Sequence, residues 1–137
     1  MLNLLSSILY NGQAGLIDLD INQEQKMLNA ASYPILFADY SMYLMQGNPK
    51  AGQSLEEVRD LLLAEVEKLK KGEFDEALLA ATVNNLKKGI QESLESNEDR
   101  ADWFVQSFIN GSNWADEVSA IDRLSKVTKQ ELVDFAN

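Results

Sequence analysis

Met27-Leu-Asn-Ala-Ala-Ser-Tyr33 and Leu36-Phe-Ala-Asp-Tyr-Ser-Met-Tyr-Leu-Met-Gln46 are the two stretches that decide the fold. The second alternates two sets of side chains: Leu36, Ala38, Tyr40, Met42 and Leu44 against Phe37, Asp39, Ser41, Tyr43 and Met45. The patterns predict strands over both stretches, bounded by Pro34 and by Gly47-Asn-Pro49. Two strands alone are marginal in water, so the pair needs helices on one face or further strands.

Helices are predicted on both sides of the strand pair. Before it, Leu2, Leu5 and Leu9 share one helical face, and a Gly-containing break at 11–15 leads to a short helix over 16–23. After it, the capping boxes Ser54-Leu-Glu-Glu57 and Thr128-Lys-Gln-Glu131 each open a helix. The apolar positions at helical spacing along the later helices are Leu55, Val58, Leu62, Val66, Leu69, Leu79, Val83, Leu86, Ile90, Leu94, Val118, Ile121, Leu124, Leu132 and Phe135.

Glycine and capping residues predict where the later helices begin and end. Gly72 suits a left-handed C-cap, and the next helix begins at Asp75. A third helix is expected over 98–109, stopped by Asn110-Gly111, and Asn113 caps a short one. Phe135 is expected to point inward, and an apolar helix that reaches the last residue predicts a boundary inside a longer protein.

Strands in one block and helices in another predict an α+β fold, with antiparallel strands packed under several helices and a helix-rich C-terminal half. At 137 residues the chain suits one domain or part of one. Residues 1–50 would supply a helix and two strands, and 51–137 the remaining helices.

Composition excludes several function classes. The chain has 12 basic and 22 acidic residues, a formal charge of −10, which disfavours nucleic acids and anionic membranes. It has no histidine and no cysteine, so a catalytic zinc site, a Ser-His-Asp triad and a cysteine nucleophile are excluded within it. We therefore expect no cofactor in this chain.

The carboxylates favour no site. Pairs such as Asp18 and Asp20, or Asp116 and Glu117, fit solvated faces and first-turn acids better than a converging glycosidase pair. Asp18-Leu-Asp20-Ile-Asn22 lacks the glycine and distant glutamate of a calcium loop. Asn110-Gly-Ser112 matches a glycosylation acceptor, but a helix C-cap explains it better. The aromatic residues expected to pack at a helix junction rather than on a ligand are Trp103, Phe104, Phe108 and Trp114.

Three segments, taken in order, resemble the second half of a structural unit of the insulinase/pitrilysin metallopeptidases. They are the helix and Gly-containing turn Ile8-Leu-Tyr-Asn-Gly-Gln-Ala-Gly-Leu16, the helix junction Leu69-Lys-Lys-Gly-Glu-Phe-Asp-Glu-Ala-Leu78, and the closing segment Ile121-Asp-Arg-Leu-Ser-Lys-Val-Thr-Lys-Gln-Glu-Leu-Val-Asp-Phe-Ala136. The two predicted strands lie between the first and second, as in the family. The resemblance covers nearly the whole chain.

This resemblance implies a partial metallopeptidase unit of the mitochondrial-processing-peptidase type. The family binds zinc through an H-x-x-E-H motif whose glutamate activates water. This chain lacks that motif, so zinc would belong to a parent protein. The implied partners are the parent's catalytic half or a partner subunit, and a peptide substrate. The family's non-catalytic halves contact substrate through an arginine and a tyrosine, and Asn22 and Asn29 stand at the matching positions here.

The resemblance thus predicts a non-catalytic wall of a peptide-enclosing chamber. The alternative is a self-contained acidic, helix-rich protein-interaction module with an exposed apolar groove. An all-carboxylate hydrolase is a third hypothesis with little in its favour. In isolation, the two strands would leave an unpaired edge that invites homo-oligomers.

Overall fold

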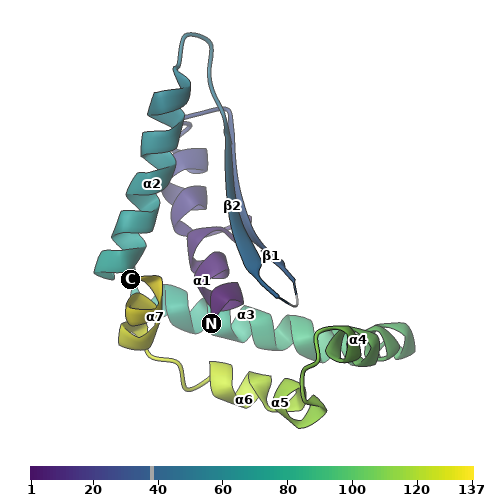
Figure 1. Cartoon of the computed structure of the whole chain (residues 1–137). Helices are drawn as coiled ribbons and strands as arrows, with labels where there is room; N and C mark the ends of the chain where they lie inside the picture. The colour runs from purple at the N-terminus through teal and green to yellow at the C-terminus, as the bar shows by residue number, and fades with distance from the viewer. Residues whose placement is uncertain (38) are drawn as a thin grey trace.

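The computed structural model describes residues 1–37 and 39–137, with Ile121 described by its backbone alone. The fold is α+β: one antiparallel hairpin and a set of helices, most of which follow it (Figure 1). In chain order the elements are α1 (Leu2–Leu9), the π-helix η1 (Asp18–Gln23), β1 (Asn29–Leu36), β2 (Ser41–Asn48), α2 (Leu55–Lys71), α3 (Glu76–Ser93), α4 (Asn97–Ile109), α5 (Trp114–Val118), α6 (Ala120–Leu124) and α7 (Lys129–Ala136). The expected fold class is confirmed.

The hairpin has one covered and one open face. Ala30 and Ser32 of β1 are buried, and Tyr43 and Met45 of β2 pack partly buried against the core. Figure 1 shows α1 and α2 on this side of the hairpin. The residues of the opposite face include Tyr33, Met42 and Leu44, which are 44%, 44% and 38% exposed.

The first strand runs past the residue that was expected to end it. It covers Asn29–Leu36 rather than 27–33, and Pro34 pairs with Tyr43. Ala30, four residues earlier, turns its backbone N–H and C=O away from β2 toward the Asn22 side chain. Because these directions alternate along an antiparallel strand, the missing N–H of Pro34 falls on the outer edge and removes no bond to β2.

The predicted position of the second strand was also wrong. It covers Ser41–Asn48, whereas the alternation predicted 36–46. Leu36 belongs to β1 and pairs with Ser41, so the alternating pattern ran through the turn between the strands. The part of that prediction at Ala38 lies outside the described residues. Gly47 does not end the strand. It pairs with Ala30, where a Cβ would lie 2.6 Å from the sulfur of Met27.

The helix ends follow the predicted capping residues. Both capping boxes form, at Ser54 and at Thr128. Gly72 ends α2 in the left-handed conformation, with φ 71°. Asp75 caps α3, Asn110 ends α4, and Gly111 follows with φ 63°. The helix expected over 98–109 begins one residue earlier, and the C-cap interpretation of Asn110-Gly111 is confirmed.

Other burial predictions were wrong. Leu55 is 72% exposed because it is the first residue of α2, outside the packed turn. Phe135 is 50% exposed, although Leu132 of the same helix is fully buried. The stripe on α3 is fully buried only at Leu79 and Val83, whereas Leu86, Ile90 and Leu94 are half-buried. The short helix expected after Asn113 is split at Ser119 into α5 and α6.

The core lies where α1, η1, the hairpin and α2 meet, closed by α3 and α7. Its buried apolar residues are Leu4, Leu5, Ile8, Leu9, Leu16, Ile17, Ile21, Met27, Ala30, Val58, Leu62, Leu69, Phe74, Leu79, Val83 and Leu132. None of them belongs to α4, α5 or α6. The chain turns into α4 at the far end of α3 and returns through α5 and α6 along α3 (Figure 1), where Leu124 of α6 packs partly buried against the core. None of the helices in the described part of the chain has the length and apolarity to cross a membrane.

Candidate functional site

The polar side chains of η1 tie three parts of the molecule together. Asp18, Asp20 and Asn22 occur at every second position of this π-helix, and each contacts a different neighbour. We call these three residues the η1 hub. Residues two apart on a helix point in different directions. The hub therefore links η1 to the loop at 11–15, to the start of β1 and to α2.

Asp18 holds the Gly-containing loop after α1. Its Oδ2 accepts hydrogen bonds from the backbone N–H groups of Asn11 and Gly15, both at 3.0 Å, and the residue is only 5% exposed. Gly15 is required there because a Cβ would lie 2.7 Å from the carbonyl oxygen of Leu9. The expectation that Asp18 is a solvated acid was wrong: it is a buried acceptor for the loop.

Asn22 holds the start of β1. Its Nδ2 donates to the Ala30 carbonyl at 2.9 Å, and its Oδ1 accepts from the Ala30 N–H at 2.8 Å. The side chain thus reproduces the pair of bonds that a neighbouring strand would make. Asn29, the other predicted substrate-contact residue, is exposed at the first position of β1, opposite Asn48. Both residues lie at the same strand start, but their contact with substrate stays a prediction.

Asp20 joins η1 to α2 through a shared lysine. Lys68 Nζ lies 2.7 Å from Asp20 Oδ2 and 3.0 Å from Glu65 Oε1. Glu65 is 3% exposed, and its Oε2 is buried without a hydrogen-bond partner in the described part of the chain. One ammonium group therefore serves two carboxyl groups, and one carboxyl oxygen is left unpaired in the interior.

The environment moves the pKa values of these groups in different directions. Burial raises the pKa of Glu65 above its ordinary value, because the loss of water outweighs the attraction of Lys68. Burial opposes the shift at Asp20, but the hydrogen bond and charge of Lys68 lower its pKa, helped by Lys26. The pKa of Lys68 is raised by its two carboxyl partners despite partial burial. The arrangement suits a structural clamp with a protonatable carboxyl.

The η1 hub does not form a metal site. Its three side chains diverge, and among the described residues no group of three acidic side chains is placed to hold a metal ion. The chain also has no histidine or cysteine. These residues do not fit a zinc site.

Sequence reasoning missed Glu65. It lies on the buried side of α2, between Leu62 and Leu69, where the pattern of apolar residues leaves a charged one at a core position. Lys68, three residues later, is the other half of the signal, because that spacing lets the two side chains meet on a helix. In the sequence, the buried ion pair was indicated only by these two charged residues, which interrupt the apolar stripe of α2.

The second group of candidates lies on the helices α4 and α5. The rings of Phe104 and Trp114 stack at 4.0 Å, and Trp103 meets Trp114 edge-on at 6.3 Å. These three rings pack at the helix junction, as expected. Phe108 was expected to join them, but it is 87% exposed. A hollow of about 310 Å³ lies between this junction and the hairpin turn, lined by residues that include Leu36, Trp103 and Asn110.

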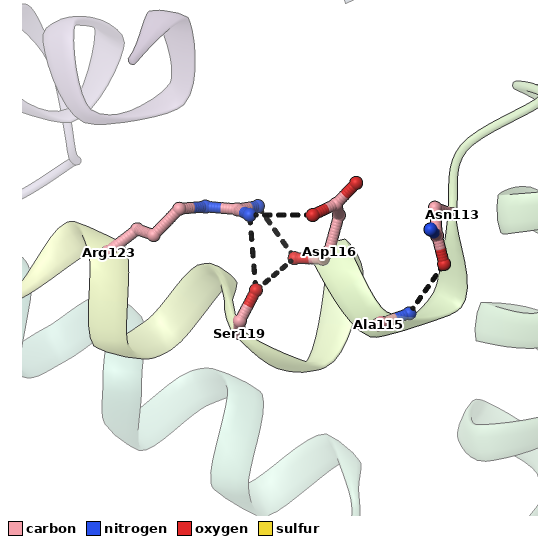
Figure 2. Close-up of polar contacts among 5 residues, drawn as sticks. All are labelled: Asn113, Ala115, Asp116, Ser119 and Arg123. Carbon is pink, nitrogen blue, oxygen red and sulfur yellow. Dashed lines mark hydrogen bonds and ion pairs between the residues drawn. The ribbon is translucent and has the colours of Figure 1, made fainter.

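The acidic residues near the junction are surface groups. Figure 2 shows Arg123 of α6 reaching back to α5, where its Nη1 lies 3.2 Å from Asp116 Oδ1 and 3.1 Å from Ser119 Oγ. Its Nη2 donates to the Asp116 carbonyl at 2.6 Å. Asn113 caps α5 by accepting from the Ala115 N–H at 3.0 Å. Asp116 is thus an exposed first-turn acid, as expected, paired across the break between two short helices.

Comparison with known proteins shows a likeness in fold. No protein-family model matches the chain, and no curated protein matches it. Among solved structures, the chain is similar to a protease from Helicobacter pylori, with a TM-score of 0.90 and 24% sequence identity. The match covers 99% of this chain and 33% of that one, so this chain spans a third of its neighbour's length. At this identity the likeness shows that the two share a fold.

Proposed function

We propose that this chain is a non-catalytic structural part of an insulinase/pitrilysin-like zinc metallopeptidase, forming one wall of the chamber that encloses a peptide substrate. The observation that carries the proposal is the match of nearly the whole chain to one third of a protease, at a TM-score of 0.90. The resemblance of its three sequence segments to the family supports it independently.

Under this proposal the chemistry resides outside the chain. Zinc, the water-activating glutamate and the histidine ligands would come from a catalytic half or a partner subunit. This chain would contribute a rigid surface. The open face of the hairpin, with Tyr33, Met42 and Leu44, is the surface we assign to the peptide. It is apolar and backed by a packed core.

Peptide binding by the isolated chain tests this assignment. The probe is a fluorescently labelled, unstructured peptide of about 20 residues, long enough to cross several strands. Binding is measured by anisotropy at moderate salt, to suppress attraction to the acidic surface. We expect weak binding that Tyr33→Ser reduces and Phe108→Ser leaves unchanged, with the peptide recovered intact in the presence of Zn²⁺.

Two outcomes would contradict the proposal. Cleavage of the peptide by the purified chain alone would show that it is itself catalytic. A loss of binding in Phe108→Ser, with Tyr33→Ser unaffected, would instead favour an interaction module that works through α4.

The interaction module is the second candidate because of the apolar surface on α4. Phe104, Val105, Phe108 and Ile109 are between 51% and 87% exposed on this one helix. Contiguous apolar side chains of this kind are typical of a protein-binding surface. The fold likeness to a protease favours the first candidate, since it accounts for the whole chain.

A further inference from the structure

Two carboxyl groups meet one cation where η1 contacts α2. Lys68 Nζ lies 2.7 Å from Asp20 Oδ2 and 3.0 Å from Glu65 Oε1, so this ammonium holds the two carboxyl groups close to each other. Glu65 is 3% exposed, and its Oε2 has no hydrogen-bond partner in the described part of the chain. A buried carboxylate oxygen without a partner is unfavourable, because it has lost its water and gained no donor in exchange.

The elements around α2 supply no second cation for this pair. Besides η1, the elements that pack against α2 include α1, β2 and α7, and the first two carry no charged side chain. On α7, Lys129 donates to the Phe74 carbonyl and Glu131 caps its own helix. Asp134 accepts from Gln130 of the same helix. The charged groups of α7 are therefore engaged away from Glu65.

The surroundings of η1 do not supply a second cation either. Asp18 is turned toward the loop at 11–15, and β1, which packs against η1, carries no charged side chain. Lys26 acts on Asp20 through its charge and forms no ion pair in the described part of the chain. Among the described residues, Lys68 is thus the cation that forms ion pairs with these two carboxyl groups.

A single proton resolves this shortage. Burial raises the pKa of Glu65, and so do the charge of Asp20 and a hydrogen bond between the two carboxyl groups. Two ionised carboxylates have no hydrogen to place between them, so that bond requires a proton on one of them. With the proton, the cluster holds one ammonium, one carboxylate and one neutral acid. Without it, the cluster has an excess negative charge beside the core of a chain whose formal charge is already −10.

We propose that Asp20 and Glu65 share a single proton and, with Lys68, form a latch between η1 and α2 that loosens when this proton is lost to solvent. The side chains of Asp20 and Lys68 are 37% and 34% exposed, so water reaches the cluster there and can take or return the proton. Once Glu65 is ionised, it competes with Asp20 for one ammonium, and the two like charges repel. The inference rests on contacts within this chain and does not depend on the proposed function.

Titration of the side-chain carboxyl carbons by NMR tests the shared proton. In the natural chain, Asp20 and Glu65 should both report the same two transitions, because coupled groups titrate as a pair. In Asp20→Asn, the transition of Glu65 should shift to lower pH, since a like charge is gone and Lys68 serves Glu65 alone. The matched control is Glu67→Gln, on the same helix in an exposed ion pair with Lys70, which should leave both transitions unchanged.

Either of two results would overturn the shared proton. One is a transition of Glu65 at the same pH in Asp20→Asn as in the natural chain, because burial alone would then explain it. The other needs no variant: it is a pair of independent transitions in the natural chain, one at each carboxyl group.

Amide hydrogen exchange tests the loosening of the latch. Glu65→Gln is the reference, because its side-chain amide can donate to Asp20 at every pH. Above the transition of Glu65, the amides of Leu19 and Lys26, which bond within and beside η1, should lose protection in the natural chain relative to Glu65→Gln. The amides of α3, which packs against α1 and α6, should differ little. Equal protection of Leu19 and Lys26 in the two proteins, or a loss spread evenly over the chain, would overturn the proposal.

Discussion

The η1 hub and the helices α4, α5 and α6, which we call the α4–α6 arm, use their polar residues in opposite ways. At the hub, polar side chains are drawn inward, and each satisfies backbone or charged groups of another element. On the arm, polar contacts stay local and exposed, and the apolar side chains face outward: α4 buries only Ser107, and α5 buries nothing. The hub side is thus the part of the chain whose structure depends on long-range contacts.

The largest expected difference is in the free energy of unfolding of two variants, each of which removes an apolar side chain: one from the core and one from the α4–α6 arm. Leu132→Ala removes a fully buried side chain that closes the core and should lower the free energy of unfolding by about 2–5 kcal/mol. Phe108→Ala removes an exposed ring from the arm and should change it by less than about 0.5 kcal/mol. Urea unfolding followed by circular dichroism measures both. Equal losses would mean that the arm is packed as tightly as the core.

The next largest effect is expected at the hub. Asn22→Ala leaves the N–H and C=O of Ala30 without their partner and should lower the free energy of unfolding by about 1–3 kcal/mol. The matched control is Asn29→Ala, at an exposed position on the same strand start, which should fall within about 0.5 kcal/mol of the natural chain. If the two asparagines behave alike, the bonds between Asn22 and Ala30 do not hold the strand.

A smaller effect should appear in the pH dependence of stability. Because the pKa of Glu65 is raised above its ordinary value of 4.5, the folded state binds this proton more tightly than the unfolded state. The resulting stability is fully present below pH 4.5 and is lost as pH rises through the folded pKa. Glu65→Gln removes this titration, so it should gain stability relative to the natural chain as pH rises.

Thermal unfolding of the natural chain and of Glu65→Gln between pH 4 and pH 9 measures the difference in stability. This range starts below the ordinary pKa of Glu65 and extends upward, because the pKa is raised in the folded state. Asp20 does not confuse the result, since its lowered pKa acts below its ordinary value of 3.8. Parallel curves for the two proteins across the window would show that Glu65 does not titrate differently in the folded state.

The smallest effect is expected on the arm. Arg123 and Asp116 form an exposed ion pair, with side chains 59% and 65% accessible. A double-mutant cycle of Arg123→Ala and Asp116→Ala should give a coupling of less than about 1 kcal/mol. A larger coupling would mean that the two short helices depend on this pair rather than on their junction with α4.

The sequence predicted most of the helical part because its signals are local. Ser54 with Glu57 and Thr128 with Glu131 specify helix starts within four residues, and Gly72 and Gly111 specify ends through their positive φ. The strands were predicted to exist but were shifted by two to five residues. Their ends depend on which backbone groups face the partner strand, as Pro34 shows, and no local pattern contains that information.

The η1 hub was largely invisible in the sequence. Asp18, Asp20 and Asn22 looked like surface acids or a poor calcium loop, because their partners lie 3 to 48 residues away along the chain. Only the tertiary fold brings Lys68 to Asp20 and Ala30 to Asn22. The family resemblance placed Asn22 and Asn29 at a substrate-contact position, and that prediction remains to be tested.

We propose that this chain is the non-catalytic part of a zinc peptidase, and isolation of the natural polypeptide is the most direct test. An antibody against the chain would recover the protein from its source cells for sizing, mass spectrometry and a peptidase assay. We expect a polypeptide or stable complex much larger than 15.3 kDa, which contains an H-x-x-E-H sequence and loses its peptidase activity when a chelator is added. A single species near 15.3 kDa with no associated peptidase would contradict it.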